Sequence, residues 1–135
     1  LLSYRGPEGY DLSQQDESDD FSSHRACTYQ QYQGEKLCRR YNAYSYYKIL
    51  NAFDTHDVGY QRGGVAAALQ RITAECLVGI STDIIFTVPE MQALHRMLPR
   101  STYHQIDSPF GHDGFLVEHE QLNRILNPFI HPTHE

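Results

Sequence analysis

The sequence lacks an apolar run long enough to cross a membrane. Its longest runs, such as CLVGI at 76–80, fall well short of the roughly 20 residues that a transmembrane helix needs, and no charged-then-apolar signal pattern opens the chain. A basic stripe is also lacking, since the net charge is −6 and charged residues make up 21%. We therefore expect a cytoplasmic protein that has neither a membrane nor nucleic acid as its partner.

Cysteine is scarce, and the spacings typical of metal and phosphate sites are absent. The three cysteines form no CxxC pair, which predicts reduced thiols that pack as small buried residues. None of the eight histidines stands in an HExxH pattern, and QRGGVA at 61–66 has neither GxGxxG nor GK[ST]. We therefore expect no metal and no bound cofactor.

Composition divides the chain into three parts. Residues 1–23 are polar and acidic, which predicts a loop or linker. Residues 24–60 carry apolar side chains at helical spacing, and we expect a helical segment that breaks near Gly34 and ends near Asp54. Six of the ten tyrosines lie between residues 24 and 53, which favours packing in a core, with contact to a ligand or to a partner helix as alternatives.

Residues 61–135 have the pattern of an α/β protein. A short helix is expected over 64–72, a strand over 75–81, a helix over 88–98 and a second strand over 102–107. A final helix carries one apolar face, formed by Leu122, Ile125, Leu126 and Phe129. Strand, helix, strand and helix with short connections predict a parallel sheet, which places ligands at the carboxyl ends of its strands.

Conspicuous polar residues follow both predicted strands. Asp83 comes directly after the first strand, and His112 and Asp113 follow the second. If the strands are neighbours, Asp83 and His112 share one rim, in the chain order of the last two members of a Ser, Asp, His triad. The carboxylate then orients the imidazole, which takes a proton from a nucleophile. Gly111 and Gly114 would allow a sharp turn that leaves the ring uncovered.

Structural roles remain open for the same residues. Asp83 is also a candidate N-cap for the helix over 88–98, and Asp113 or Gly114 a candidate cap for the last helix. The nucleophile is a further gap, because GxSxG is absent from the 135 residues. Ser81 in GISTD has a glycine two places before it, but Asp83 stands where the second glycine belongs.

Three motifs, in order, resemble one known family. TYQQYQGEKLCRRYNAYSYYKIL at 28–50, LVGISTDIIFTVPEMQAL at 77–94 and YHQIDSPFGHDGFLVEHEQL at 103–122 are similar to the C-terminal portion of homoserine O-acetyltransferases. The resemblance implies the C-terminal part of an α/β-hydrolase fold, with residues 24–60 in a helical lid. Pro89 stands two places later than in the family, which changes the start of the following helix slightly.

The resemblance also implies the chemistry and its residues. The acetyl group passes from acetyl-CoA, the co-substrate, to the hydroxyl of L-homoserine through a serine acyl-enzyme. This reaction belongs to methionine biosynthesis. Asp83 and His112 match the triad aspartate and histidine, and Asp113 matches a substrate-binding aspartate that pairs with the homoserine ammonium. The nucleophilic serine belongs to an earlier part of such enzymes, so we expect this chain alone to be an inactive fragment. The lid helices imply a homodimer.

Two alternatives stay open. One is another acyltransferase or esterase of the same fold, using succinyl-CoA or serine, because the residues that choose the acyl donor lie largely outside this segment. The other is a non-catalytic interaction module that pairs through its tyrosine-rich helices.

Overall fold

The computed structural model describes residues 2–16, 19–20, 24–73 and 75–131, so part of the predicted linker (1, 17–18 and 21–23) lies outside the described residues. The elements, in chain order, are η1 (Leu2–Tyr4), α1 (Pro7–Gln14), α2 (Arg25–Arg40), α3 (Ala43–Asp54), α4 (Val65–Leu69), β1 (Glu75–Ile80), α5 (Val88–Met97), β2 (Ser101–Ile106), η3 (Gly111–Leu116) and α6 (His119–Ile130).

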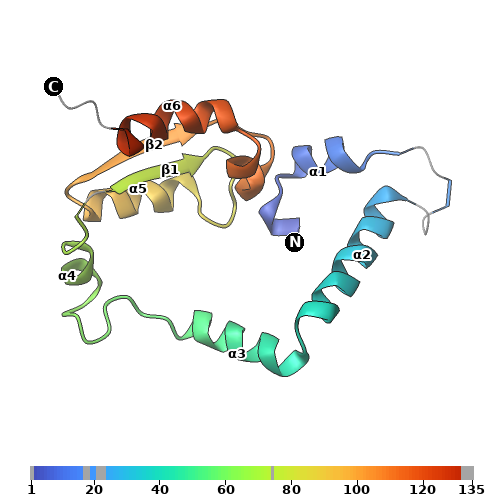
Figure 1. The fold of residues 1–135 in the computed structure, drawn as a ribbon, viewed down its shortest axis with the longest axis horizontal. Helices are drawn as coiled ribbons and strands as arrows, with labels where there is room; N and C mark the ends of the chain where they lie inside the picture. Colours follow the sequence, from blue (N-terminus) through green and yellow to red (C-terminus); the bar gives the residue numbers. More distant parts are fainter. Residues whose placement is uncertain (1, 17–18, 21–23, 74, 132–135) are drawn as a thin grey trace.

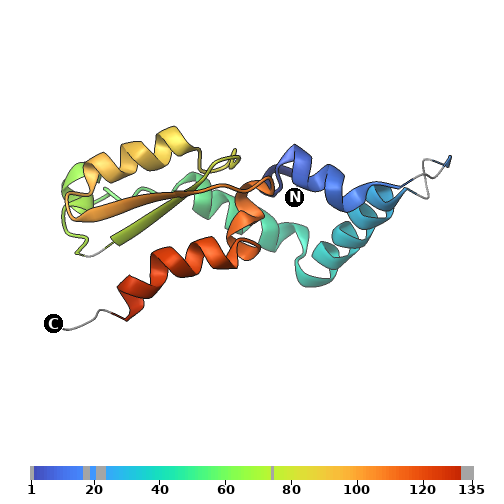
Figure 2. The same cartoon turned by 90° about the horizontal axis from the view of Figure 1, so that it is seen from above.

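The second half of the chain forms an α/β unit. β1 and β2 pair in parallel, with a register that runs from Glu75 opposite Ser101 to Ile80 opposite Ile106. α5 connects the two strands, and Figures 1 and 2 show α5 and α6 on opposite faces of the sheet. The predicted order of strand, helix, strand and helix is confirmed, and the carboxyl ends of both strands meet at one edge.

The described core is small. Ile80 and Ile106 close the carboxyl ends of the strands and are 5% and 1% exposed, and Leu98 after α5 is 3% exposed. Many large apolar side chains remain at the surface, among them Tyr44 and Phe53 on α3. An apolar surface of this extent is typical of a face that contacts another polypeptide.

The N-terminal segment contains a helix where the sequence predicts a loop. Pro7 stands in the first turn of α1, where its lack of an N–H costs nothing, and Glu8 favours the same turn by its charge. α1 packs on the loop that follows β2, since Gly9 N donates to Pro109 O over 3.1 Å. A Cβ on Gly9 would lie 2.6 Å from the Phe110 ring, so the close approach explains this glycine.

The helical segment breaks at a different place from the one predicted. Gly34 lies inside a continuous α2, and the break comes at Tyr41 and Asn42. Asn42 caps α3 by accepting a 2.8 Å hydrogen bond from Ser45 N, which stops α2 and redirects the chain. α1, α2 and α3 follow one another in an arc that leaves the α/β unit at η1 and returns to it at α4 (Figure 1).

Two predictions about burial are wrong. The tyrosines of α2 and α3 do not enter a core, because Tyr32, Tyr44 and Tyr47 are 55%, 69% and 61% exposed. The cysteines are not buried either: Cys38 is exposed, and the other two are intermediate. Spacing predicts that a helix has an apolar face without indicating what covers it.

Candidate active site

The two strand ends bring Asp83 and His112 together. His112 Nδ1 lies 2.8 Å from Asp83 Oδ2, and the Asp83 side chain is only 3% exposed. The other oxygen, Oδ1, accepts hydrogen bonds from Ile85 N at 2.8 Å and Phe86 N at 3.1 Å. Both oxygens of the carboxylate are therefore engaged, and its orientation is fixed.

This contact sets the tautomer of the imidazole. An ionised carboxylate only accepts hydrogen bonds. His112 Nδ1 therefore carries a hydrogen and donates a hydrogen bond to Asp83 Oδ2. Nε2 is left with a lone pair that can take a proton from a hydroxyl. The imidazole retains 23% side-chain exposure, which keeps it accessible to a reacting group.

Hydrogen bonds between the two strand-end loops hold this geometry. Thr82 Oγ1 donates to Ser108 O over 2.6 Å and accepts from Gly111 N over 3.0 Å. Ser81 Oγ accepts from Ser108 N over 3.3 Å. Thr82, the residue before Asp83, is therefore hydrogen bonded to Gly111, the residue before His112.

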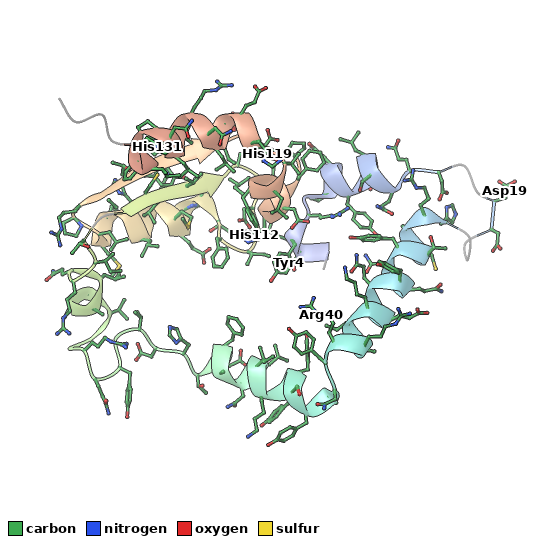
Figure 3. The ribbon with its side chains drawn as sticks, viewed as in Figure 1. Tyr4, Asp19, Arg40, His112, His119 and His131 are labelled. Carbon is green, nitrogen blue, oxygen red and sulfur yellow. The ribbon has the colours of Figure 1, made fainter. Side chains whose placement is uncertain are left out.

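Three aromatic rings surround His112. The ring centroids of Tyr4, Phe86 and Phe115 lie 5.4, 5.3 and 5.4 Å from that of His112. Tyr4 comes from η1 at the start of the chain, and Figure 3 shows it beside His112. The rings limit how the imidazole can turn and exclude water from part of its surface.

The glycines flanking His112 and Asp113 have different structural reasons. Gly111 has φ of 59°, in the left-handed region, and a Cβ there would lie 2.4 Å from Gly6 N. Gly114 is required by close packing, because a Cβ would lie 2.8 Å from Ser108 Oγ. The turn that presents His112 therefore depends on conformation at one glycine and on space at the other.

Asp113 has a partner that the sequence analysis missed. Arg5 Nε donates to Asp113 Oδ2 over 3.3 Å, and the same guanidinium contacts Ser13 Oγ at 3.2 Å and Tyr29 Oη at 3.3 Å. Arg5 lies in SYRGPEGY, within the predicted linker. A lone cation between an aromatic residue and a Gly-Pro turn is the only signal that could have drawn attention to it.

The helix-cap alternatives do not hold. Thr87 caps α5 in a capping box with Glu90, and hydrogen bonds from the hydroxyl and the N–H of Thr87 hold the pKa of Glu90 below its ordinary value. α6 has Glu118 at its N-cap. Neither Asp83 nor Asp113 therefore occupies the N-cap of a following helix.

Part of the triad chemistry has no counterpart in the described residues. Within residues 2–16, 19–20, 24–73 and 75–131, no serine or cysteine hydrogen bonds to His112, and no group of three metal-ligating side chains gathers.

Over the same residues, every helix is too short or too polar to span a membrane.

An apolar hollow of about 380 Å³ adjoins the Asp83–His112 pair. Val78 and Ile80 of β1 line it from the sheet, and Met91 and Leu94 line it from α5. Phe86 and Phe115 at its rim are 53% and 46% exposed. The pair thus lies at the edge of a surface that a further apolar element can cover.

Comparisons with known proteins identify relatives of one kind. No family model matches the chain. Homoserine O-acetyltransferases from Cyclobacterium marinum and Thermus thermophilus are each 41% identical to it, over 96% of its length, and one from a Mycobacterium species is 38% identical over 93%. The predicted resemblance is therefore confirmed. The chain spans only 37%, 33% and 36% of those relatives, respectively.

A solved structure matches a smaller part of the chain. The trigonal crystal structure of an acetylester hydrolase from Corynebacterium glutamicum covers 53% of this chain and 23% of its own, with 28% identity and a TM-score of 0.44.

Proposed function

We propose that this chain supplies the aspartate and histidine of the catalytic triad in a homoserine O-acetyltransferase. The observation that carries the proposal is the 2.8 Å contact between His112 Nδ1 and the buried Asp83 carboxylate. Relatives of that name align over nearly the whole chain. The α/β unit is then the C-terminal part of a hydrolase fold, and residues 24–60 belong to its lid.

In the proposed reaction His112 transfers protons and Asp83 stabilises its charged form. His112 Nε2 takes the hydroxyl proton of a serine from outside these residues as that oxygen attacks the thioester carbonyl of acetyl-CoA, and it returns the proton to the departing thiolate. His112 then takes the proton of the homoserine hydroxyl, whose oxygen attacks the acyl-enzyme carbonyl, and it gives that proton to the serine oxygen as the bond to the acetyl group breaks. Asp83 stabilises the imidazolium that forms in both halves.

Asp113 is proposed to bind the amino group of homoserine. It adjoins His112 in the chain, and its side chain is 28% exposed, with one oxygen held by Arg5. Within the described residues no hydrogen bond reaches its other oxygen, Oδ1, which leaves an acceptor for an ammonium group close to the proton carrier.

A chimera tests the proposal. In it, residues 1–135 replace the matching segment of the Cyclobacterium marinum homoserine O-acetyltransferase. We expect release of free CoA that depends on homoserine, with O-acetylhomoserine identified by mass spectrometry. His112→Ala should lower kcat about a millionfold and Asp83→Asn about ten-thousandfold, by analogy with other triads. His119→Ala is the matched control, because His119 is exposed on α6.

The same chimera separates the alternatives. Transfer from succinyl-CoA, transfer to serine, or homoserine-independent hydrolysis of acetyl esters at a higher rate would indicate another acyltransferase or an esterase. A folded chimera with none of these activities would favour a non-catalytic module and overturn the proposal.

A homodimer through the lid helices belongs to the same proposal. α3 exposes Ile49, Leu50 and Phe53 at 42%, 44% and 75%, and a hollow of about 330 Å³ lies between Ile49, Ala52, Phe53 and His56. An exposed apolar helix face that contains a hollow supports helix pairing between two copies of the protein.

A further inference from the structure

A third hollow, of about 510 Å³, lies between η1, α2 and α3. Tyr4 borders it from η1, Lys36 and Arg40 from α2, and Tyr46 from α3. Figure 3 shows the Arg40 side chain extending from the end of α2 toward Tyr4. Among the described residues that line it, none is acidic.

The two cations act from one face of one helix. Lys36 and Arg40 are four residues apart on α2, so their side chains are neighbours. Within the described part of the chain no carboxylate pairs with either of them, whereas Arg39 is neutralised by Glu35 at 3.2 Å. In a chain with a net charge of −6, this hollow is a local positive region.

Both cations lie near aromatic rings. Lys36 Nζ lies 5.9 Å from the centroid of the Tyr32 ring, and Arg40 Cζ lies 5.4 Å from that of Tyr41. A cation on an aromatic face keeps its charge and its hydrogen-bond donors. Both side chains therefore remain able to bind an anion.

Tyr4 connects this hollow to the Asp83–His112 pair. Its ring contacts His112 at a centroid distance of 5.4 Å and also lines the positive hollow. Tyr4 therefore borders both sites, and a ligand whose anionic end binds Lys36 and Arg40 can extend past Tyr4 to the proton carrier. A CoA thioester has this form, with phosphates at one end, an uncharged arm, and a reactive carbonyl at the other.

We propose that Lys36 and Arg40 bind the phosphate groups of the acyl donor. This inference rests on the proposed function and adds the residues that select a phosphorylated thioester. Arg40 supplies a planar fork for two phosphate oxygens and Lys36 a compact charge. Tyr46 forms the apolar wall opposite α2.

The test compares two donors in the chimera. Acetyl-CoA and acetyl-pantetheine share the thioester and the arm, but only acetyl-CoA carries phosphates. In the double variant Lys36→Ala/Arg40→Ala, the preference for acetyl-CoA, measured as a ratio of kcat/KM values, should fall roughly tenfold, which is modest because both cations are exposed. Arg39→Ala, which removes a paired cation from the same helix, should leave the ratio unchanged.

Two outcomes would overturn the proposal: an unchanged ratio in the double variant, or an equal fall in Arg39→Ala. Either result with an active parent chimera refutes this inference alone, whereas a parent chimera that folds but is inactive refutes the proposed function. Calorimetric titration of CoA and pantetheine into chimeras that carry His112→Ala measures binding without turnover. Equal affinities for the two ligands, or CoA affinity that the double variant leaves intact, would also refute the site.

Discussion

Arg5 and Asp113 are 108 positions apart in the sequence, yet Arg5 Nε lies 3.3 Å from Asp113 Oδ2. The guanidinium also stacks over the Tyr29 ring, 5.2 Å from its centroid. Arg5 therefore ties the segment before α1, helix α2 and the residue after His112 into one unit. This network fixes Asp113 from one side.

Replacement of Arg5 by alanine should weaken homoserine binding. Without the guanidinium, Asp113 loses the contact that orients it, and we expect the KM for homoserine in the chimera to rise roughly fivefold, as for loss of a partly exposed ion pair, with a smaller change in kcat. Arg5→Lys should restore part of the loss. Arg100→Ala is the control, since Arg100 donates to Ile72 O away from the site. A lower KM would mean that Arg5 competes with the substrate ammonium.

Replacement of Gly111 by alanine should destabilise the turn that carries His112. The left-handed conformation at φ 59° costs an L-residue roughly 1–2 kcal/mol, and the new Cβ would also press against Gly6 N at 2.4 Å. Urea unfolding of the chimera should show a loss of more than about 2 kcal/mol.

Gly34→Ala provides the matched comparison. Gly34 lies inside α2 with nothing within 4 Å of an added Cβ, so alanine should stabilise the protein by about 1 kcal/mol. Equal effects of the two substitutions would contradict the conformational account of Gly111.

The pairing of Asp83 with His112 could be predicted from the sequence because two simple rules apply. Short connections to a helix make neighbouring strands parallel, and parallel strands end at the same edge. Each polar residue follows its strand closely, so little chain remains to separate them. The bounds of β1, α5 and β2 agree with the predicted ranges within one residue for the same reason, because apolar periodicity is strong there, whereas α4 ends at Leu69, three residues before the predicted end.

The Arg5 network could not be predicted, because no local pattern records a contact across 108 positions. The break at Asn42 was missed for a different reason. Glycine lowers helix stability, but Gly34 has no structural requirement to end α2, whereas the Asn42 side chain replaces a backbone partner at the start of α3. The exposure of the tyrosines could not be predicted from their spacing either, because it depends on whether another segment or another protein covers the apolar face.

The stability that Glu90 gives to α5 should depend on pH. Its pKa is lowered in the folded protein by hydrogen bonds from Thr87, so this contribution is present above the unfolded-state pKa and is lost as the pH falls through the folded-state pKa. Glu90→Gln should therefore lower the Tm of the chimera at neutral pH, with a difference from the parent that shrinks toward about pH 3. A difference that is constant with pH would exclude the carboxylate as its cause.

Charge placed on α3 should weaken self-association if the lid helices form the dimer. Tyr47 and Phe53 are 61% and 75% exposed, and glutamates at these positions would face each other or apolar side chains across the contact. Sedimentation of the chimera with Tyr47→Glu/Phe53→Glu should show a shift from dimer to monomer. Leu12→Glu, on exposed α1, is the control, and an unchanged mass in the double variant would count against the lid interface.

The 135-residue chain alone should not transfer acetyl groups. His112 has an orienting acid at 2.8 Å, but GxSxG is absent from the sequence. Loss of the serine from a triad costs about a millionfold in kcat. Acetyl-CoA and homoserine mixed with the isolated chain should therefore yield free CoA at the buffer rate, and the chimera at the same concentration provides the positive control. CoA release by the isolated chain that His112→Ala abolishes would instead reveal a nucleophile within these residues, for which Ser81 is the first candidate.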